Sequence, residues 1–168
     1  MSLSPQVIFI ELTKGLPKFI DGRIDFTGVR KAPVLNVVVA YKDEILIVKR
    51  SDNVSAYQGL WNGISGFIDE PKSIEEFASQ ELGEELSVNP ADATIVVCEP
   101  YEVDDKGINR VWVVYPVLAE FKEKPKITLD WEHTDYKWIK RSELSDFEYV
   151  KDFDKSVDIA LEKTGKKR

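Results

Sequence analysis

Cysteine is almost absent from this sequence of 168 residues: Cys98 stands alone, inside an apolar run. A single cysteine cannot form an intramolecular disulfide, which fits a reducing compartment. Long hydrophobic runs are also absent, since none reaches the roughly 18 residues of a membrane-spanning helix, and the N-terminal residues lack a basic stretch followed by an apolar core. We therefore expect a cytoplasmic protein that makes no membrane contact.

Positive charge is scarce relative to negative charge. The chain has 23 Lys and Arg against 30 Asp and Glu, which gives a net charge of −7. Polymeric nucleic acid is bound mainly by basic side chains that displace counterions from its phosphates, so this balance argues against such a partner. Small anionic substrates stay compatible with it if metal ions bridge them. At this length the chain is most simply one domain with a single core.

Basic residues are missing altogether from one predicted helix. Ser73 and Glu76 have the spacing of a capping box, which places the helix start at Ser73, and Asn89-Pro90 predicts its end. The segment between these signals contains no Lys or Arg, and its glutamates are Glu75, Glu76, Glu81, Glu84 and Glu85. Such a concentration of negative charge needs a physical reason.

Three of these glutamates do not belong to the solvent face of the helix. At 3.6 residues per turn, Glu81 and Glu85 share the angular sector of Ala78, and Glu84 lies beside Phe77. Carboxylates at such spacings can converge, and like charges about 4 Å apart repel by roughly 1 kcal/mol in water and about 4 kcal/mol at an effective dielectric of 20. An acidic surface helix is the alternative. We favour a site for Mg²⁺ or Mn²⁺, which prefer hard oxygen ligands.

The stretch from Gly66 to Val88 resembles the sequence box of the Nudix hydrolases. That box runs Gly, five residues, Glu, seven residues, Arg-Glu-apolar, one residue, Glu-Glu, one residue, Gly-apolar. The matching positions are Gly66, Glu81, Leu82, Glu84, Glu85 and Val88. Lys72 replaces the first Glu, Gln80 replaces the Arg, and Ser87 replaces the late Gly. The Glu-x-x-Glu-Glu core is intact.

The resemblance implies an α/β (α+β) fold, a Nudix-type α/β/α sandwich with a mixed β-sheet, and it extends from about residue 34 to about residue 163. Apolar patterns predict two strands within 34–50 about a Lys42-Asp43 turn, then strands at 60–64, 93–103, 111–121 and 136–139. A helix with apolar residues from Val150 to Leu161 is expected to pack across the sheet and to end near Gly165.

Residues 1–30 lie before the region of resemblance. The β-branched residues 6–12 predict a strand, and Asp21-Gly22 predicts the turn of a small hairpin over 18–26. We expect residues 1–30 to form a strand and hairpin extension that packs on the domain or lies at a homodimer interface, and residues 31–168 to form the Nudix domain.

The activity that the resemblance implies is metal-dependent hydrolysis of a diphosphate linkage in a small nucleoside diphosphate derivative, giving a nucleoside monophosphate and phospho-X. The Mg²⁺ or Mn²⁺ ligands that it implies are Gly66, through its carbonyl, Glu81, Glu84 and Glu85. Glu84 and Glu85 also belong to the implied catalytic group. Glu132, in a polar loop six residues before Trp138, is the candidate for a further ligand or general base, although exposed loop acids are commonly just solvated.

The candidate substrate contacts are Arg50, Trp61, Lys72 and Arg110. A guanidinium fork matches phosphate oxygens, so Arg50 and Arg110 are candidate phosphate contacts, with a strand-end charge and a cross-strand salt bridge as the respective alternatives. Lys72 either replaces the missing box cation or touches phosphate. Trp61 offers a face to a nucleobase or packs in the core. We expect His133 to be a surface residue rather than a catalyst.

Two other functions remain open at this point. A Nudix-fold module that binds or senses a nucleotide derivative with little or no hydrolysis is favoured by the exchanges at Lys72 and Gln80. An isopentenyl diphosphate isomerase is disfavoured, because that enzyme needs a reactive cysteine near the start of the box and Cys98 lies on a later strand.

Overall fold

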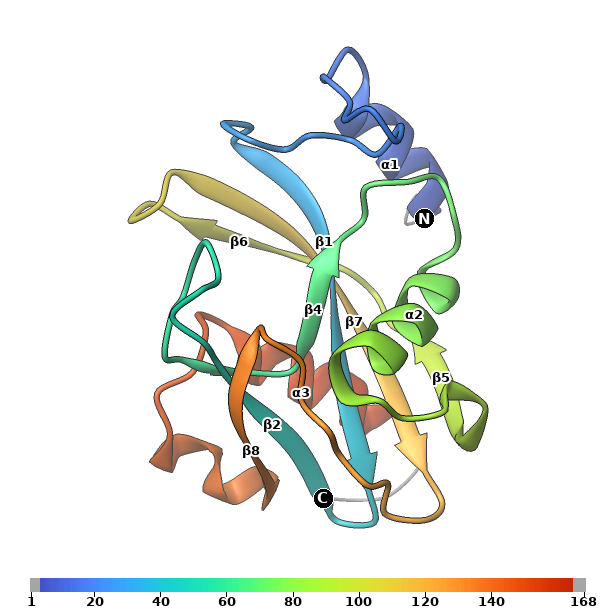
Figure 1. Ribbon diagram of the computed structural model, residues 1–168, viewed down its shortest axis with the longest axis vertical. Helices are drawn as coiled ribbons and strands as arrows, with labels where there is room; N and C mark the ends of the chain where they lie inside the picture. Colours follow the sequence, from blue (N-terminus) through green and yellow to red (C-terminus); the bar gives the residue numbers. More distant parts are fainter. Residues whose placement is uncertain (1–3, 165–168) are drawn as a thin grey trace.

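The computed structural model describes residues 4–164, and its framework is one mixed β-sheet with helices on both faces (Figure 1). In chain order the elements are α1 Pro5–Thr13, β1 Lys31–Tyr41, β2 Glu44–Arg50, β3 Trp61–Asn62, β4 Ile64–Phe67, α2 Ile74–Leu86, η1 Pro90–Asp92, β5 Ala93–Val97, β6 Tyr101–Asp105, β7 Arg110–Phe121, β8 His133–Lys140, η2 Arg141–Asp146 and α3 Phe153–Glu162. The predicted fold class is confirmed. Within residues 4–164, no helix is long and apolar enough to cross a membrane.

Strand β1 lies at the centre of the sheet. It pairs in parallel with β7 along its whole length and in antiparallel orientation with β2 and β4. Strands β5 and β6 both pair with β7, whereas β3 and β8 both pair with β2. The apolar runs of β1 and β7 are buried on both faces, as expected for strands that are covered by helices on both sides.

Each face of the sheet has its own hydrophobic cluster. Leu35 and Val37 of β1 belong to the cluster under α2, and Val38 and Ala40 belong to the cluster under α3. The side chains that α2 buries in the first cluster are Ile74, Phe77, Ala78, Leu82 and Leu86, which is the predicted apolar stripe. Because α2 is fixed along this whole stripe, its glutamates are carried by a rigid element.

Both ends of α2 follow the local signals in the sequence. The Ser73 hydroxyl accepts a hydrogen bond from the Glu76 amide at 3.1 Å, so the helix begins where the capping box predicts. At the other end Ser87 adopts the left-handed conformation, with φ of 56°. A side chain in that conformation costs roughly 1 kcal/mol relative to glycine. The helix therefore ends in the left-handed geometry that glycine favours, but serine occupies that position.

The strand predicted over residues 6–12 is wrong, because these residues form α1. Ser4 caps the helix by accepting from the Val7 amide at 3.3 Å, and a proline occupies the first turn. Such a start signal outweighs the β preference of the apolar residues, since a strand is stable only when a partner strand is available. Phe9 and Ile24 belong to the cluster under α2, and a bridge between Lys18 and Ile24 closes the Asp21-Gly22 turn. The homodimer role of this extension and the boundary after residue 30 stay predictions.

The single strand predicted over residues 93–103 is also wrong, because it forms the two strands β5 and β6. The break contains Pro100, which has no amide hydrogen for the ladder. Both strands still pair with β7, and the Cys98 amide donates to the Pro116 carbonyl at 2.9 Å within the break. Strand β8 begins at His133, earlier than the predicted residue 136. The predicted helix end at Gly165 lies outside the described residues.

Candidate metal and substrate site

The site lies where three segments meet: the C-terminal half of α2, strand β4 and the loop that enters β8. This loop is fastened to the end of α2, since the Thr128 amide donates to the Leu86 carbonyl at 3.0 Å and the Asp130 amide donates to the Glu85 carbonyl at 3.2 Å. These backbone hydrogen bonds bring Glu132 beside Glu85, although the two residues are far apart in the sequence.

Glu85 is a buried carboxylate that forms no salt bridge within residues 4–164, although the charge of Arg50 acts on it from nearby. Glu85 is only 3% exposed, and its Oε2 atom has no hydrogen-bond partner within residues 4–164. Burial, followed by the carboxylates of Glu132 and Glu81, raises the pKa of Glu85 far above its usual range. A buried acid of this kind is costly unless a cation binds it.

Glu81 shares this environment. Burial raises the pKa of Glu81 to about 7, and the carboxylates of Glu84 and Glu132 add to the effect by repulsion. A Cβ atom placed on Gly66 would lie 2.9 Å from the Glu81 Oε1 atom. Only glycine therefore leaves room for this carboxylate so close to the β4 backbone. The structure thus brings together Gly66 and Glu81, two of the predicted metal ligands, and their roles as ligands stay predictions.

His133 is not a surface residue, so that expectation is wrong. It is 6% exposed, and burial lowers its pKa, which favours the neutral imidazole. Its Nδ1 atom lies 3.1 Å from the Asp130 Oδ1 atom. Carboxylate oxygens of Glu85 and Glu132 and a ring nitrogen of His133 all lie within 4.8 Å of one another. The sequence contained a signal for this cluster, because Glu132 and His133 are adjacent and follow closely after Asp130.

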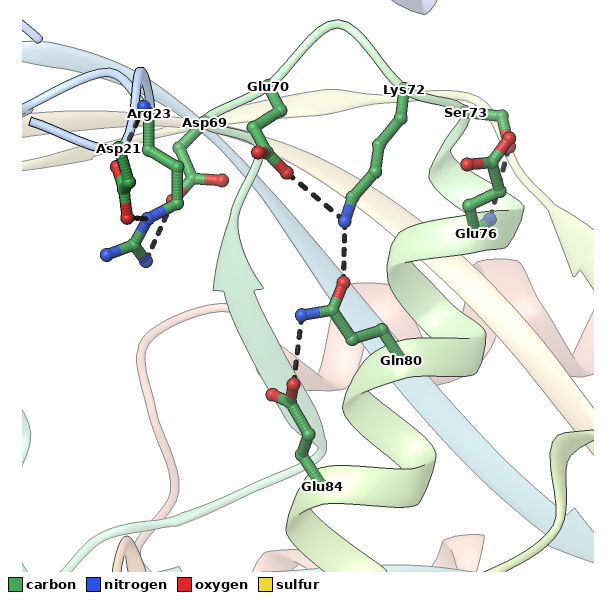
Figure 2. A network of polar contacts seen from close by, with 9 residues as sticks. All are labelled: Asp21, Arg23, Asp69, Glu70, Lys72, Ser73, Glu76, Gln80 and Glu84. Carbon is green, nitrogen blue, oxygen red and sulfur yellow. Dashed lines mark hydrogen bonds and ion pairs between the residues drawn. The ribbon is translucent and has the colours of Figure 1, made fainter. Parts of the chain in front are cut away.

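Glu84 is exposed, so the expectation that it lies off the solvent face is wrong. Its carboxylate is held by polar contacts along the outside of α2 (Figure 2). The Gln80 side chain donates from Nε2 to the Glu84 carboxylate at 2.9 Å and accepts at Oε1 from the Lys72 ammonium at 2.6 Å. Lys72 also forms an ion pair with Glu70 at 3.2 Å and lies 4.6 Å from the centroid of the Phe77 ring. We call the series Glu70, Lys72, Gln80 and Glu84 the exposed relay.

A cavity of about 590 Å³ opens beside the acid cluster. Gly66 and Glu132 line it near that cluster, and Arg50 and Arg110 also belong to its wall. Arg50 donates to the Ala56 carbonyl at 3.0 Å; burial lowers its pKa, and the nearby Glu132 and Glu85 oppose that change. Two of the four predicted substrate contacts thus line the cavity, and their contact with a substrate stays a prediction.

The other two predicted contacts lie elsewhere. Trp61 is buried in the cluster under α3, with its ring centroid 5.3 Å from that of Phe147. It therefore packs in the core, which was the alternative to a contact with a nucleobase. Lys72 belongs to the exposed relay. Neither is among the described residues that line the cavity. Substrate contact by either residue stays a prediction without structural support.

Aromatic side chains make up much of the cavity wall. Arg110 lies with its guanidinium carbon 5.0 Å from the Trp112 ring centroid and 5.8 Å from that of Phe67. The Trp112 indole donates to the Tyr57 hydroxyl at 2.9 Å, which fixes the position of that ring. Trp131, which is 64% exposed, stands at the edge. Nothing in the local sequence pattern distinguished Trp112 or Trp131, because only the pairing of distant strands brings them to the cavity.

Comparison with known proteins identifies the family. The model of the NUDIX domain matches residues 30–158. Similar solved structures include a Nudix hydrolase from M. smegmatis, RenU, with a TM-score of 0.63 and 18% identity over 81% of this chain and 86% of that one. The NUDIX domain of Shewanella oneidensis NrtR, solved with ADP ribose, has a TM-score of 0.64 and 21% identity over 83% and 93%. A C. elegans Ap4A hydrolase has a TM-score of 0.62 and 19% identity over 82% and 98%.

No curated protein matches the chain. At these identities the solved structures establish a shared fold, whereas the domain match covers most of the sequence. The chain belongs to the NUDIX domain family.

Proposed function

We propose that the protein hydrolyses the diphosphate linkage of a nucleoside diphosphate derivative, giving a nucleoside monophosphate and phospho-X, with Mg²⁺ or Mn²⁺ as cofactor. The observation that carries this proposal is the buried Glu85 carboxylate, which has an oxygen without a partner among the described residues. It clusters with Glu132, a residue that lines a cavity together with aromatic and arginine side chains. A divalent cation would resolve the unfavourable charge and serve the reaction at once.

The donor set fits such an ion. Hard carboxylate oxygens of Glu81, Glu84 and Glu85, together with the Gly66 carbonyl, are the ligands that Mg²⁺ and Mn²⁺ prefer. The orphaned Glu85 oxygen and the absence of room for a Cβ at Gly66 both support this set. When bound, the ion would supply Lewis-acid neutralisation of the diphosphate and a more acidic water.

Glu132 is the proposed general base, acting through a carboxylate oxygen that is not bound to a metal ion. It lies within the cluster formed with Glu85 and also lines the cavity, so it stands between the acids of α2 and the space available to a substrate. A carboxylate there would orient the attacking water and accept its proton. General-base assistance contributes about 10²- to 10⁴-fold to rate.

The cavity wall provides two kinds of substrate contact. The guanidinium groups of Arg50 and Arg110 match phosphate oxygens, and the exposed ring of Trp131 suits a planar base. With Lys151, these arginines give a wall that is basic inside an acidic protein. We therefore propose a small anionic nucleotide derivative as the ligand, in the cytoplasm, rather than nucleic acid or membrane.

A direct test is incubation of the protein with Mg²⁺ or Mn²⁺ and a panel of ADP-ribose, nucleotide sugars, dinucleoside polyphosphates, coenzyme A and damaged nucleoside triphosphates, with detection of the released monophosphate. We expect turnover of at least one compound and its loss in Glu85→Gln. Glu75→Gln is the matched control, because Glu75 is an exposed glutamate at the opposite end of α2.

A binding or sensing module is the second candidate function. The exchanges at Lys72 and Gln80 favour it, since both positions of the Nudix box beside the glutamates have changed. Metal-independent binding of a panel compound, without turnover of any of them, would support the sensing module and contradict the hydrolase.

A further inference from the structure

We propose that His133 is a nitrogen ligand in a metal position shared with Glu85 and Glu132, and that this position selects Mn²⁺ over Mg²⁺. This inference deepens the proposed function, on which it rests for the presence of a divalent ion. It adds a residue outside the Nudix box and an imidazole to a ligand set that otherwise contains only oxygen.

The geometry of the cluster is the first support. One ligand atom from each of Glu85, Glu132 and His133 lies within 4.8 Å of the others, a span that one ion can bridge. The three come from two segments held in register, since the Asp130 amide donates to the Glu85 carbonyl at 3.2 Å. The ligands are therefore brought together by backbone hydrogen bonds that exist before any ion binds.

The second support is independent of the distances. The Glu85 side chain is more than nine-tenths buried, and its Oε2 atom finds no hydrogen-bond partner within the described residues. Buried carboxylate oxygens are nearly always satisfied, so an orphaned one requires a missing partner. A cation held between Glu85, Glu132 and His133 would provide it.

Asp130 supplies the third support, because it orients the imidazole. Its Oδ1 atom lies 3.1 Å from the His133 Nδ1 atom and also accepts from the Glu132 amide at 3.2 Å. When Nδ1–H donates to this carboxylate, the other ring nitrogen keeps a lone pair. A histidine that is bound to metal is commonly held by a carboxylate in this manner.

Ligand chemistry determines which ion the position favours. Mg²⁺ takes oxygen ligands almost exclusively, whereas imidazole favours first-row transition ions. Mn²⁺ shares the preference of Mg²⁺ for carboxylate oxygen, but as a first-row transition ion it accepts an imidazole beside two carboxylates more readily than Mg²⁺ does. Loss of the nitrogen should therefore reduce Mn²⁺ affinity more than Mg²⁺ affinity.

The test uses the fact that His133 is the only histidine in the sequence. Untagged protein is loaded with Mn²⁺, and pulsed electron paramagnetic resonance is used to detect the ¹⁴N coupling of a directly bound imidazole. We expect this coupling in the wild type and its loss in His133→Asn, with Mn²⁺ affinity falling at least about tenfold. Mg²⁺ affinity should change less, and Glu75→Gln should leave both affinities unchanged.

The wild-type spectrum decides the question even if the variant folds poorly. Mn²⁺ bound without imidazole coupling would overturn the role of His133, whether or not the protein hydrolyses a substrate. Coupling without turnover across the substrate panel would confirm the ligand and contradict only the hydrolase proposal.

Discussion

Glu84 and Glu85 are adjacent on α2, yet the protein treats their charges in opposite ways. Glu84 is exposed and receives a hydrogen bond from Gln80, which is in turn held by the Lys72 ammonium. Glu85 is buried beside two further carboxylates and keeps an oxygen without a partner among the described residues. The negative charge on the exposed side of the helix is thus satisfied by neighbouring side chains and solvent, whereas the charge on the buried side needs a bound cation.

The largest expected effect follows from neutralising the buried side. Glu85→Gln should lower kcat at least about 100-fold and abolish tight binding of the metal, because the ligand and its charge disappear together. The metal-free variant should nevertheless be more stable than the wild type, by about 1 to 3 kcal/mol, since an unpaired buried acid is removed. Urea unfolding in EDTA measures the stability, and titration calorimetry with Mn²⁺ measures the affinity.

Glu84→Gln is the matched comparison for this result. It removes one carboxylate from the exposed side, where solvent and Gln80 already satisfy it, so metal-free stability should change by less than about 0.5 kcal/mol. Equal gains in stability for both variants would show that burial does not distinguish the two glutamates.

The stability of the metal-free protein should depend on pH because the carboxylates on the buried side of α2 have raised pKa values. The pKa values of Glu81, at about 7, and of Glu85 are raised in the folded state above the usual 4.5, so the folded protein holds protons that the unfolded chain has released. Stability is therefore greatest below about pH 4.5 for these groups and falls as the pH rises toward the folded pKa values. Between pH 5 and 7 each of the two groups should contribute a loss on the order of 2 kcal/mol.

Urea unfolding in EDTA across this range, with wild type and Glu85→Gln in parallel, isolates the contribution of the buried acids. The variant should show a flatter profile than the wild type. A wild-type stability that increases from pH 5 to 7, with the same slope in the variant, would contradict the raised pKa values.

Gly66→Ala should have a smaller effect that is confined to the site. The new Cβ would lie 2.9 Å from the Glu81 Oε1 atom, which is the end of a flexible side chain and can move. Stability should therefore change by less than about 1 kcal/mol, while displacement of Glu81 should weaken metal affinity about tenfold. Calorimetry and thermal unfolding measure the two quantities.

Gly83→Ala provides the control on the same helix. A Cβ at Gly83 meets nothing within 4 Å, so alanine should stabilise the helix by about 0.5 to 1 kcal/mol and leave metal affinity unchanged. Similar losses of affinity in both variants would mean that the close contact at Gly66 is unimportant.

The sequence predicted α2 and the burial of Glu85 because their signals are local, whereas Glu84, which was also expected off the solvent face, is exposed. Ser73 marks the start of the helix by its own hydrogen bond, and the 3.6-residue period separates the buried Glu85 from the exposed Glu75. The central strands followed from apolar runs for the same reason. Where local signals conflicted, as in the Val and Ile residues after Ser4-Pro5, the prediction of a strand failed because pairing depends on distant neighbours.

The rest of the site depends on contacts that no local pattern contains. His133 is buried because its strand pairs with β2 at Arg50 and its loop is bonded to the end of α2. Trp112 and Trp131 reach one cavity only through the assembled sheet. Trp61, a candidate stacking residue in the sequence, proved to be part of the core for the same reason.

The smallest expected effect concerns the exposed relay, and it tests whether Lys72 and Gln80 changed together. A glutamine side chain has one donating and one accepting end, so with Glu84 at its donating end it needs a donor such as Lys72 at the other. An arginine at position 80 has only donors, so it would need acceptors on both sides, and the first Glu of the Nudix box, at position 72, and Glu84 would provide them. Lys72→Glu alone should therefore weaken metal affinity about two- to fivefold through Glu84, in line with the small energies of exposed pairs. Adding Gln80→Arg should restore the affinity to within about twofold, and calorimetry of the single and double variants measures the coupling. If the two changes simply add, each position acts alone and the relay does not position Glu84.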